Sequence, residues 1–183
     1  AALPLFLAPL RLLGSALEAD GATAFVCTSA ERASNIKHRP IYIMSSAHAL
    51  PAAAGRNGES WDESGASWLA PELFGVAGVT PKDINVIGFY DHFSTVIITK
   101  LEDYGFCQRG EGGPFVEEGS IELGGEIPVN TSGGHLSEAY LQGMNQIIEV
   151  VRQLRGDSYA QVENAELGLV DSGDGAGALI LRR

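Results

Sequence analysis

The clearest pattern of apolar and polar positions lies in the stretch from Val129 to Arg155. Its apolar residues recur in steps of three and four, which predicts one face of a single helix. The residues on that stripe are Leu136, Tyr140, Leu141, Met144, Ile147, Ile148, Val151 and Leu154. A Gly-bearing loop, residues 130–134, precedes the helix, and Gly156 is a suitable stop. Such a loop brings backbone N–H groups to a point where a carbonyl oxygen or an anion can bind, although a core helix with an ordinary loop gives the same pattern.

Apolar runs elsewhere alternate between strand-like and helix-like segments. The predicted strands are residues 22–28, 40–45, 84–89 and two runs within 166–183 that flank a Gly-Asp-Gly turn. The predicted helices are residues 10–18, 67–77 and 94–104, with a short helix or loop at 29–36. A further helix start is expected at Thr80-Pro81, and Pro71 is acceptable only in a first helical turn. Strands that alternate with helices and close on a hairpin indicate an α/β domain with a layered mixed sheet.

Two stretches predict irregular structure. Residues 49–67 are rich in Ala, Gly, Pro and Ser and indicate a long loop and a domain boundary. Trp61 and Trp68 lie in or beside this loop, and we expect packed side chains there rather than a partner surface. Residues 107–126 are rich in Gly and Glu and predict a solvated surface loop with little regular structure.

Composition and charge restrict the function classes. An apolar content of 45% supports a packed core, and a net charge of −11 disfavours nucleic acid and anionic membranes as partners. No run of about 18 uncharged apolar residues predicts a transmembrane helix. Two cysteines make no disulfide framework; we expect Cys27 to be buried and Cys107 to be the more accessible thiol. The apolar opening lacks a basic region and carries Arg11, so we expect an internal segment of a larger protein.

Three short stretches carry the candidate chemistry. They are Tyr90-Asp91-His92-Phe93, the Gly133-Gly134 loop with Tyr140, and Asp171-Ser172-Gly173. They would converge if each follows a strand or opens a helix at the same edge of the sheet. Phenols, carboxylates, imidazoles and backbone amides suit proton transfer beside a carbonyl. No spaced cluster of His, Cys and Asp predicts a metal site, and no phosphate-binding glycine motif occurs. The competing interpretation makes both tyrosines core residues with satisfied hydroxyls.

Four blocks of sequence together resemble the thiolase superfamily. The blocks are PLRLLGSALEADGATAFVCTSAERA (9–33), AGVTPKDINVIGFYDHFS (77–94), VNTSGGHLSEAYLQG (129–143) and LGLVDSGDGAGALIL (167–181). They are similar to the sterol-carrier-protein type thiolases and their lipid-transfer-protein relatives, over nearly the whole chain. The resemblance implies a thiolase-like fold in which residues 1–50 end the N-terminal half and residues 51–183 form the C-terminal domain. The N-terminal half with the usual acylated Cys, absent from this chain, would complete a five-layer αβαβα fold.

Four positions depart from the thiolase pattern. Tyr90 stands where thiolases of this branch usually have His or Asn. Counting from the glycine pair, the family's His falls at Tyr140 and the following Pro at Leu141. The C-terminal Cys or His of thiolases falls at Asp171. The resemblance therefore implies that the groups for Claisen chemistry are replaced, and that the chain is more similar to the steroid side-chain aldolases of the superfamily.

These aldolases cleave a β-hydroxyacyl-CoA into a ketone and a shorter acyl-CoA, which is propionyl-CoA in the steroid case. The reaction needs a base for the β-hydroxyl proton, an acid for the enolate carbon and donors for the thioester oxygen. The resemblance implies that Tyr90 and Tyr140 supply the acid and base roles, in either order. A phenol is a weak base near neutral pH, so its pKa would need lowering. The supporting catalytic candidates are Asp91, His92 and His135. The expected substrate-binding residues are Gly133, Gly134, Asp171 and Gly173, with backbone amides near Gly173 as oxyanion donors.

Two alternative functions stay open. One is a non-catalytic thiolase-like subunit that binds acyl-CoA, and the other is an atypical acetyl-CoA acyltransferase. The resemblance also implies an OB-fold acyl-CoA-associated partner that carries a zinc-ribbon segment, and a thiolase-type homodimer. We expect a cytoplasmic enzyme of lipid metabolism and steroid degradation, with coenzyme A only as part of its substrate. No metal, nucleic-acid or membrane site is expected.

Overall fold

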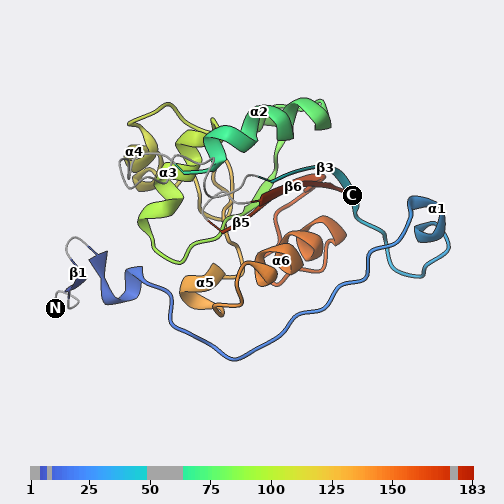
Figure 1. The fold of residues 1–183 in the computed structure, drawn as a ribbon, viewed down its shortest axis with the longest axis horizontal. Helices are drawn as coiled ribbons and strands as arrows, with labels where there is room; N and C mark the ends of the chain where they lie inside the picture. Colours follow the sequence, from blue (N-terminus) through green and yellow to red (C-terminus); the bar gives the residue numbers. More distant parts are fainter. Residues whose placement is uncertain (1–4, 8–9, 49–63, 174–176) are drawn as a thin grey trace.

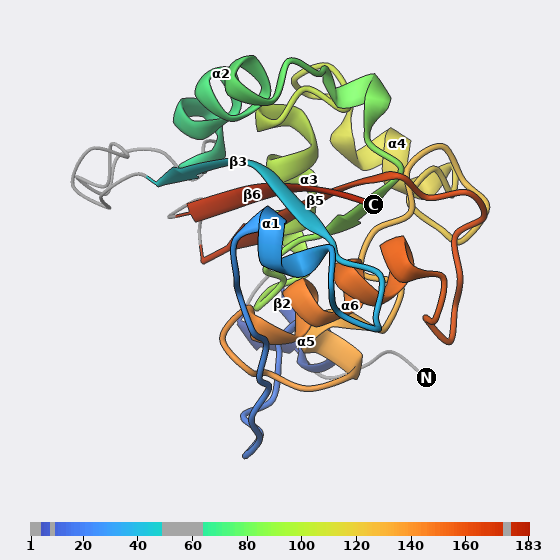
Figure 2. The same cartoon turned by 90° about the vertical axis from the view of Figure 1, so that its right-hand side faces the viewer.

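A four-stranded mixed sheet forms the centre of the computed structural model (Figures 1 and 2). The structure describes residues 5–7, 10–48, 64–173 and 177–183. The strand order is β3–β6–β5–β4; β6 is antiparallel to both of its neighbours, whereas β4 and β5 are parallel. The strands are β3 (Tyr42–His48), β4 (Val86–Gly88), β5 (Leu167–Ser172) and β6 (Gly177–Arg182). The predicted closing hairpin and the mixed sheet are confirmed.

Helices cover both faces of this sheet (Figure 1). On one face lie α2 (Ala66–Ala77), α3 (Thr95–Asp103) and α4 (Gly112–Glu117). On the other face lie α5 (Gly134–Ser137) and α6 (Met144–Arg155). Successive side chains of a strand point to opposite faces, so Leu169 packs on the α2 side and Val170 packs on the α6 side. This three-layer arrangement confirms the predicted α/β fold class.

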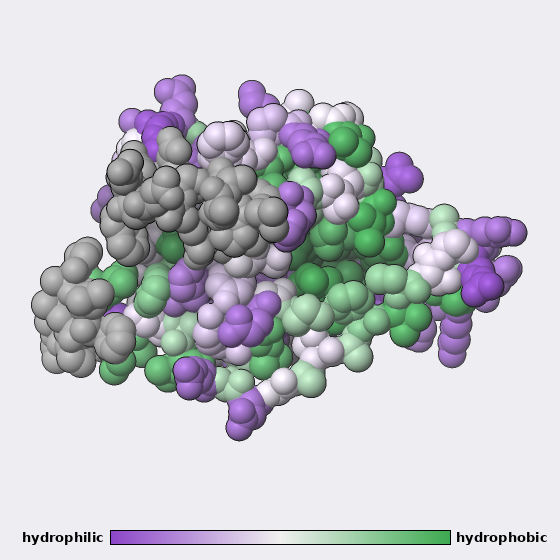
Figure 3. All heavy atoms as spheres, viewed as in Figure 1, coloured by the Kyte–Doolittle hydropathy of each residue, from purple (hydrophilic) through white to green (hydrophobic). Residues whose placement is uncertain are grey.

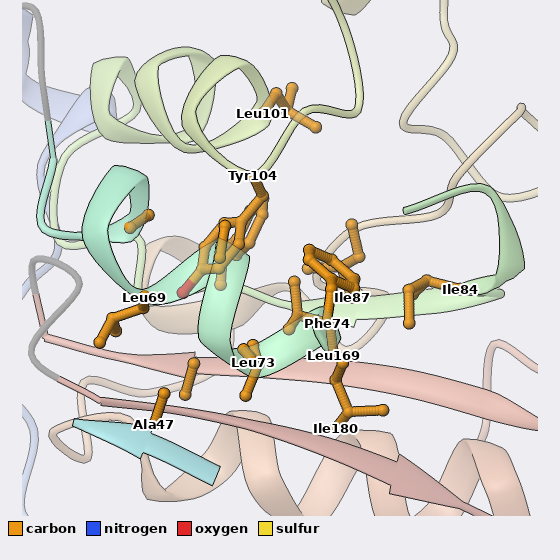
Figure 4. Packing of buried hydrophobic residues seen from close by; sticks show 14 of the residues in the cluster. Ala47, Leu69, Leu73, Phe74, Ile84, Ile87, Leu101, Tyr104, Leu169 and Ile180 are labelled. Carbon is orange, nitrogen blue, oxygen red and sulfur yellow. The ribbon is translucent and has the colours of Figure 1, made fainter. Parts of the chain in front are cut away.

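The core between the sheet and α2 and α3 fixes the position of α3 (Figure 4). Leu73, Leu101 and Leu169 are each fully buried in it. Burial of one such side chain contributes about 1.5–3 kcal/mol. The Tyr104 ring stacks on Phe89, with their ring centroids 5.5 Å apart. The face of α3 that meets the sheet is therefore held firmly next to the end of β4.

Helix α6 approaches the opposite face closely because two strand positions lack side chains. A Cβ at Gly88 would lie 3.0 Å from Cβ of Gln146, and one at Gly168 would overlap Val150. Val150 and Leu154 of α6 are fully buried against the sheet. The close approach brings the first turn of α6 beside the residues that follow β4.

The stretch after Gly134 contains two helices instead of the predicted one. α5 ends at Ser137, α6 begins at Met144, and Gln142 (φ 55°) and Gly143 (φ 85°) take left-handed backbone conformations between them. An α-helix cannot contain such residues, so the prediction of one helix is wrong.

The buried face of α6 is also rotated from the predicted apolar stripe. Its most buried residues are Asn145, Gln146, Glu149, Val150, Gln153 and Leu154. The polar members make buried hydrogen bonds; for example, the Gln153 amide donates to Glu149 and to the carbonyl of Ala160. Hydrophobic periodicity could not identify this face, because hydrogen bonds rather than apolar side chains satisfy much of it.

The N-terminal segment differs most from its prediction. Residues 22–28, predicted as a buried strand, form an extended segment without ladder pairing. Val26 is 94% exposed and Phe25 is 48% exposed, and Cys27 is exposed rather than buried. Figure 3 shows apolar surface along this edge of the molecule. An apolar run is buried only where another layer covers it, and the described part of the chain supplies no such layer here.

The helix predicted over residues 10–18 is absent as well. β1 (Leu5–Leu7) pairs with β2 (Leu10–Arg11), and a 3-10 turn, η1 (Leu12–Gly14), follows. Beyond this turn, Ser15 pairs with Phe93 and Glu18 pairs with Tyr140 through isolated bridges. Beyond the turn the segment is extended, because its backbone groups bond to these two loops.

Helix α2 departs from its prediction in two respects. Pro71 lies inside the helix, beyond the first turn, where it has no N–H to donate to the carbonyl of Ser67. Trp68 is 62% exposed, so the expectation that it packs is wrong. Trp61 lies outside the described residues, as does most of the predicted boundary loop, and the division at residue 50 stays a prediction.

Three short elements complete the comparison with the sequence. α1 (Ala30–Ala33) agrees with the short helix or loop expected there. The helix start at Thr80 leads only into a 3-10 turn, η2 (Pro81–Asp83), and hydrogen bonds from the Thr80 hydroxyl and N–H lower the pKa of Asp83. α4 interrupts the predicted loop over 107–126. Cys107 packs against the α2–α3 core, and this burial raises its pKa to about 11, so it is not the more accessible thiol.

Candidate active site

Tyr90 and Tyr140 meet beside the end of β4. Tyr90 follows that strand and is 8% exposed, whereas Tyr140 lies in the break between α5 and α6 and is half-buried. Their hydroxyl oxygens are 2.7 Å apart, and the Tyr90 hydroxyl donates to Oε1 of Gln142 at 3.1 Å. The predicted convergence of the two loops therefore occurs, and the break between the helices makes it possible.

Asn130 holds the glycine loop against the residue before Tyr90. Its side-chain oxygen accepts the Phe89 N–H at 2.8 Å, and its amide nitrogen donates to the Phe89 carbonyl at 2.9 Å. The backbone of Asn130 is left-handed (φ 50°), a conformation that Asn tolerates better than most residues. Its own N–H donates to the carbonyl of Ile87, so the loop continues the sheet by one short pairing. The Asn130 amide thus bonds the backbone N–H and C=O of Phe89, as a neighbouring strand would, at the residue after β4 ends.

Asp91 occupies the place at the start of α5 where the sequence predicted an anion site. Its carboxylate accepts the backbone N–H of His135 at 2.8 Å, the N–H of Leu136 and the Gln146 amide at 3.1 Å. Gly134 is left-handed (φ 60°), and a Cβ there would overlap this carboxylate. Burial raises the pKa of Asp91 despite these donors. The anion bound at the glycine loop is therefore a carboxylate of the chain itself.

His135 lies beneath both tyrosines. Its ring centroid is 4.5 Å from that of Tyr90 and 4.9 Å from that of Tyr140. Its Nε2 accepts the Gly143 N–H at 2.9 Å, which assigns the ring proton to Nδ1, 3.4 Å from Oδ1 of Asp91. Burial, with the Lys100 and His92 charges, lowers the pKa of His135 to about 4, so the imidazole is neutral near pH 7. His135 thus holds Gly143, three residues after Tyr140; its predicted supporting role in catalysis stays a prediction.

His92 and the N-terminal segment form one side of the site. The His92 ring centroid is 5.3 Å from that of Tyr90, and its carbonyl accepts the N–H of Ala16 at 2.9 Å. A cavity of about 420 Å³ lies between residues within 18–23 and the break that carries Tyr140 and Gln142. Tyr140 therefore lines a space large enough for part of a small-molecule ligand, whereas Tyr90 lies behind it.

Asp171 lies in the interior and not at the cavity. It is fully buried on the α3 side of β5 and pairs with the ammonium group of Lys100, also fully buried. Lys100 further donates to the carbonyls of Tyr90 and Gly173 at 2.9 Å and 3.1 Å. Gly173 thus offers its carbonyl to a lysine; its predicted amide role stays a prediction, as do the substrate-binding roles of Gly133, Gly134 and Asp171.

Sequence reasoning missed three residues of this region, and each had a signal. Lys100 stands on the same helical stripe as Ile97, Leu101 and Tyr104, where a charge interrupts an apolar face. Gln142 lies in the break within the predicted apolar helix, and Gln146 lies in the first turn of α6 that follows it. Polar residues at positions that a helix buries require partners, and such positions are the ones to inspect for a site.

The described residues exclude two other kinds of feature. Within residues 5–7, 10–48, 64–173 and 177–183, no three His, Cys, Asp or Glu side chains are grouped to hold a metal ion. Among the helices of those same ranges, none is long and apolar enough to cross a membrane. The expectation that coenzyme A enters only as part of a substrate, with no other cofactor, stays a prediction.

Fold and site together define an α/β protein with paired tyrosine hydroxyls at the end of a sheet strand, a site suited to acid–base chemistry. The thiolase C-terminal domain-like family matches residues 55–179, and the chain belongs to this family. The resemblance to the thiolase superfamily is therefore confirmed.

Curated relatives include a lyase named for a pregnene carboxyl-CoA ester and an aldolase named for the cleavage of steroid side chains. The chain is 42% identical over 180 residues to the 17-hydroxy-3-oxo-4-pregnene-20-carboxyl-CoA lyase of Mycobacterium tuberculosis, covering 91% of this chain and 45% of the relative. It is 38% identical over 174 residues to a steroid side-chain-cleaving aldolase of Thermomonospora curvata, covering 91% and 44%. An acetyl-CoA acetyltransferase of Methanothermobacter thermautotrophicus is 37% identical over 174 residues, with coverage of 92% and 45%. The chain thus spans a little under half the length of these relatives.

A solved structure shares the fold. The Ltp2-ChsH2(DUF35) aldolase superposes with a TM-score of 0.91 at 35% sequence identity, over 98% of this chain and 49% of that chain. The superposition extends over nearly the whole chain, so it includes the exposed N-terminal segment as well as the sheet.

Proposed function

We propose that the complete protein is a carbon–carbon lyase that cleaves a steroid side-chain β-hydroxyacyl-CoA into a ketone and propionyl-CoA. The observation that carries this proposal is the pair of tyrosine hydroxyls, 2.7 Å apart, of which Tyr140 lines the cavity. Identities of 42% and 38% to two enzymes of this class support the same substrate type. The retro-aldol reaction needs only one mobile proton, which two phenols can hold.

The geometry favours Tyr140 as the base and Tyr90 as its partner. Tyr140 reaches the cavity, and Tyr90 can donate to it along the 2.7 Å hydrogen bond. A hydrogen bond donated to a phenolate stabilises the charged form, whereas exclusion of water opposes it, so the hydrogen bond from Tyr90 is what would favour a phenolate at Tyr140. While Tyr140 is protonated, the Tyr90 hydroxyl donates its hydrogen bond to Oε1 of Gln142 instead.

The reaction then balances without an external acid. Phenolate oxygen of Tyr140 takes the β-hydroxyl proton, and the electrons of that O–H bond form the ketone C=O. The Cα–Cβ bond breaks, and its electron pair becomes the enolate of the propionyl thioester. The proton now on Tyr140 passes to the enolate carbon and regenerates the phenolate, so the substrate yields a ketone and propionyl-CoA.

The other participants belong to the same proposal. Coenzyme A enters only as part of the substrate, and no metal or separate cofactor is invoked. An OB-fold acyl-CoA-associated partner is supported by the two components in the name of the Ltp2-ChsH2(DUF35) aldolase. We further propose a homodimer in the cytoplasm, on the resemblance alone, with no nucleic-acid or membrane partner.

The test uses the complete protein with its candidate partner. A β-hydroxy steroid side-chain acyl-CoA is added, and release of propionyl-CoA is followed by mass spectrometry. Tyr140→Phe should lower kcat by about 10²–10⁴-fold, the usual contribution of a positioned acid–base group. Tyr159→Phe is the matched control, because that side chain is fully exposed and its change should leave kcat unaltered.

Three other outcomes would redirect the proposal. Release that persists in Tyr140→Phe would remove Tyr140 from the chemistry. No release by the unaltered protein, with acyl-CoA binding intact, would favour the non-catalytic subunit. A covalent acyl-cysteine trapped with a reactive acyl donor would favour the acyltransferase.

A further inference from the structure

Lys100 and Asp171 form a fully buried ion pair behind Tyr90. Lys100 comes from α3 and Asp171 from β5, and neither side chain is accessible to solvent. The Lys100 ammonium donates to Asp171, to the Tyr90 carbonyl at 2.9 Å and to the Gly173 carbonyl at 3.1 Å. An ammonium group has three protons, so each of them has a partner in this arrangement.

The carboxylate of Asp171 completes the contact with Tyr90. It accepts the backbone N–H of Tyr90 and the hydroxyl of Tyr104 at 2.9 Å. Burial and the adjacent Asp171 charge raise the pKa of Tyr104 well above its usual value, so that phenol stays a donor. The ion pair therefore contacts both the N–H and the C=O of the residue that carries the inner tyrosine hydroxyl.

Such a pair is costly as a purely structural feature. Removing two charges from water opposes folding, and apolar residues of similar size often stabilise a fold as well or better. The surrounding core is apolar: Phe89, Leu101 and Leu169 are all fully buried. A charged pair in this core is best explained by what it holds in place.

The ammonium group also lies near the tyrosine ring itself. Its nitrogen is 5.7 Å from the centroid of the Tyr90 ring, within the range of a cation–π contact. Backbone and ring of Tyr90 are thus both held from the α3 side, while His135 packs against the ring from the α5 side. The hydroxyl can then reach Tyr140 only in a narrow range of positions.

We propose that the Lys100–Asp171 ion pair is a positioning device that fixes Tyr90 so that its hydroxyl stays hydrogen-bonded to Tyr140. This inference rests on the proposed retro-aldol function. It gives Asp171 a role behind the reacting groups, instead of the contact with substrate that the sequence predicted. Neither residue of the pair touches the substrate; both act through Tyr90.

The first experiment replaces the pair by apolar residues of similar size. The double variant Lys100→Met/Asp171→Leu removes both charges, so neither ion is left buried without its counter-ion. The Tyr104 hydroxyl and the backbone groups of Tyr90 and Gly173 lose their partners, so a urea transition first checks that the variant folds cooperatively. In the complete protein we expect kcat for propionyl-CoA release to fall by about 10–100-fold, because small displacements of a catalytic group are costly. KM should change by less than about threefold, because the pair does not contact the acyl-CoA.

A matched control separates positioning from general loss of stability. Glu149 is another buried carboxylate, and its hydrogen bonds go to Thr131, Gln153 and Ser158. Glu149→Gln should lower the melting temperature with kcat within about twofold of the unaltered protein. An equal fall of kcat in this control would overturn the inference.

A kinetic double-mutant cycle asks whether the pair acts through Tyr90. In a Tyr90→Phe background, the double replacement should lower kcat by less than about twofold more, because the hydroxyl that it positions is already gone. A further loss as large as in the unaltered background would mean that the pair acts elsewhere, and the inference would be wrong.

Crystal structures keep the two proposals distinguishable. If the unaltered protein releases no propionyl-CoA, the proposed function fails, but the variant structure still tests the positioning. A Tyr90–Tyr140 hydroxyl pair that is broken in Lys100→Met/Asp171→Leu and intact in Glu149→Gln supports the device. A hydroxyl distance unchanged from 2.7 Å in the double variant overturns it.

Discussion

Gly134 allows the packing beneath the tyrosine pair to be tested by a single methyl group. Its backbone is left-handed (φ 60°), and a Cβ there would overlap the Asp91 carboxylate and lie 2.7 Å from Nδ2 of Asn130. Gly156 is the matched position: it is also left-handed (φ 82°), and nothing lies within 4 Å of the same added atom. Both alanine variants therefore place a Cβ in a left-handed backbone conformation, but only Gly134→Ala also brings that Cβ into contact with Asp91 and Asn130.

The expected losses follow from these two terms. A residue with a Cβ in the left-handed region costs about 1–2 kcal/mol. Forcing an extra group into a filled site costs about 1–3 kcal/mol more. We therefore expect the free energy of unfolding to fall by about 2–5 kcal/mol in Gly134→Ala and by about 1–2 kcal/mol in Gly156→Ala. Displacement of Asp91 also disturbs the start of α5, so only Gly134→Ala should lower kcat, by about 10–100-fold.

Urea unfolding of the complete protein, followed by circular dichroism, measures both free energies. Propionyl-CoA release at a temperature well below the transition measures kcat for the same samples. Equal losses of stability in the two variants would refute the inferred collision, because they would mean that Asp91 moves aside at no cost. Equal kcat values would refute the link between the Asp91 contact and the tyrosine loop.

The remaining predictions concern titration, reactivity and packing. Burial lowers the pKa of His135 from 6.5 to about 4, so between these pH values the imidazole is protonated in the unfolded chain and neutral in the folded one. The free energy of unfolding should therefore fall as the pH drops from 6.5 to about 4, and NMR should show a neutral His135 imidazole at pH 5. Cys107, with its pKa raised to about 11, should resist iodoacetamide at pH 8 until urea is added, as read by mass spectrometry. Gly168→Ala should lower the free energy of unfolding by about 1–3 kcal/mol, because its Cβ would overlap a methyl group of Val150. In a Val150→Ala background, which lacks that methyl group, the same Gly168→Ala change should lower the free energy of unfolding much less.

Apolar patterning identified the parts of the fold that bury apolar surface. The runs at residues 167–172 and 177–182 became the paired strands β5 and β6, and the stretch over 67–77 became α2. The same reasoning failed for residues 22–28, which are as apolar as a strand but lie on the surface of this chain. A sequence pattern reports which residues favour burial, and not whether the described chain supplies the surface that covers them.

The break between α5 and α6 could not be predicted from periodicity for a different reason. Leu136, Tyr140 and Leu141 continue the apolar spacing into Met144, so the pattern has no gap. The actual signal is Gly143, whose left-handed backbone is held by a hydrogen bond to His135, eight residues earlier in the same stretch. This side-chain contact lies between the end of one helix and the start of the next, and helix propensity does not contain that information.

Resemblance identified Tyr90 and Tyr140 as a pair, but their environment follows from polar residues in buried places. Lys100 interrupts an apolar stripe of α3, and Gln146 lies where α6 meets the sheet. Neither would be retained in a helix selected only for packing, because each must find partners in the interior. Their partners are the backbone of Tyr90 and the carboxylate of Asp91, which are consecutive residues after β4. The two helices on opposite faces of the sheet thus each supply one buried polar side chain to the same short loop, and the loop that they fix carries the inner hydroxyl of the site.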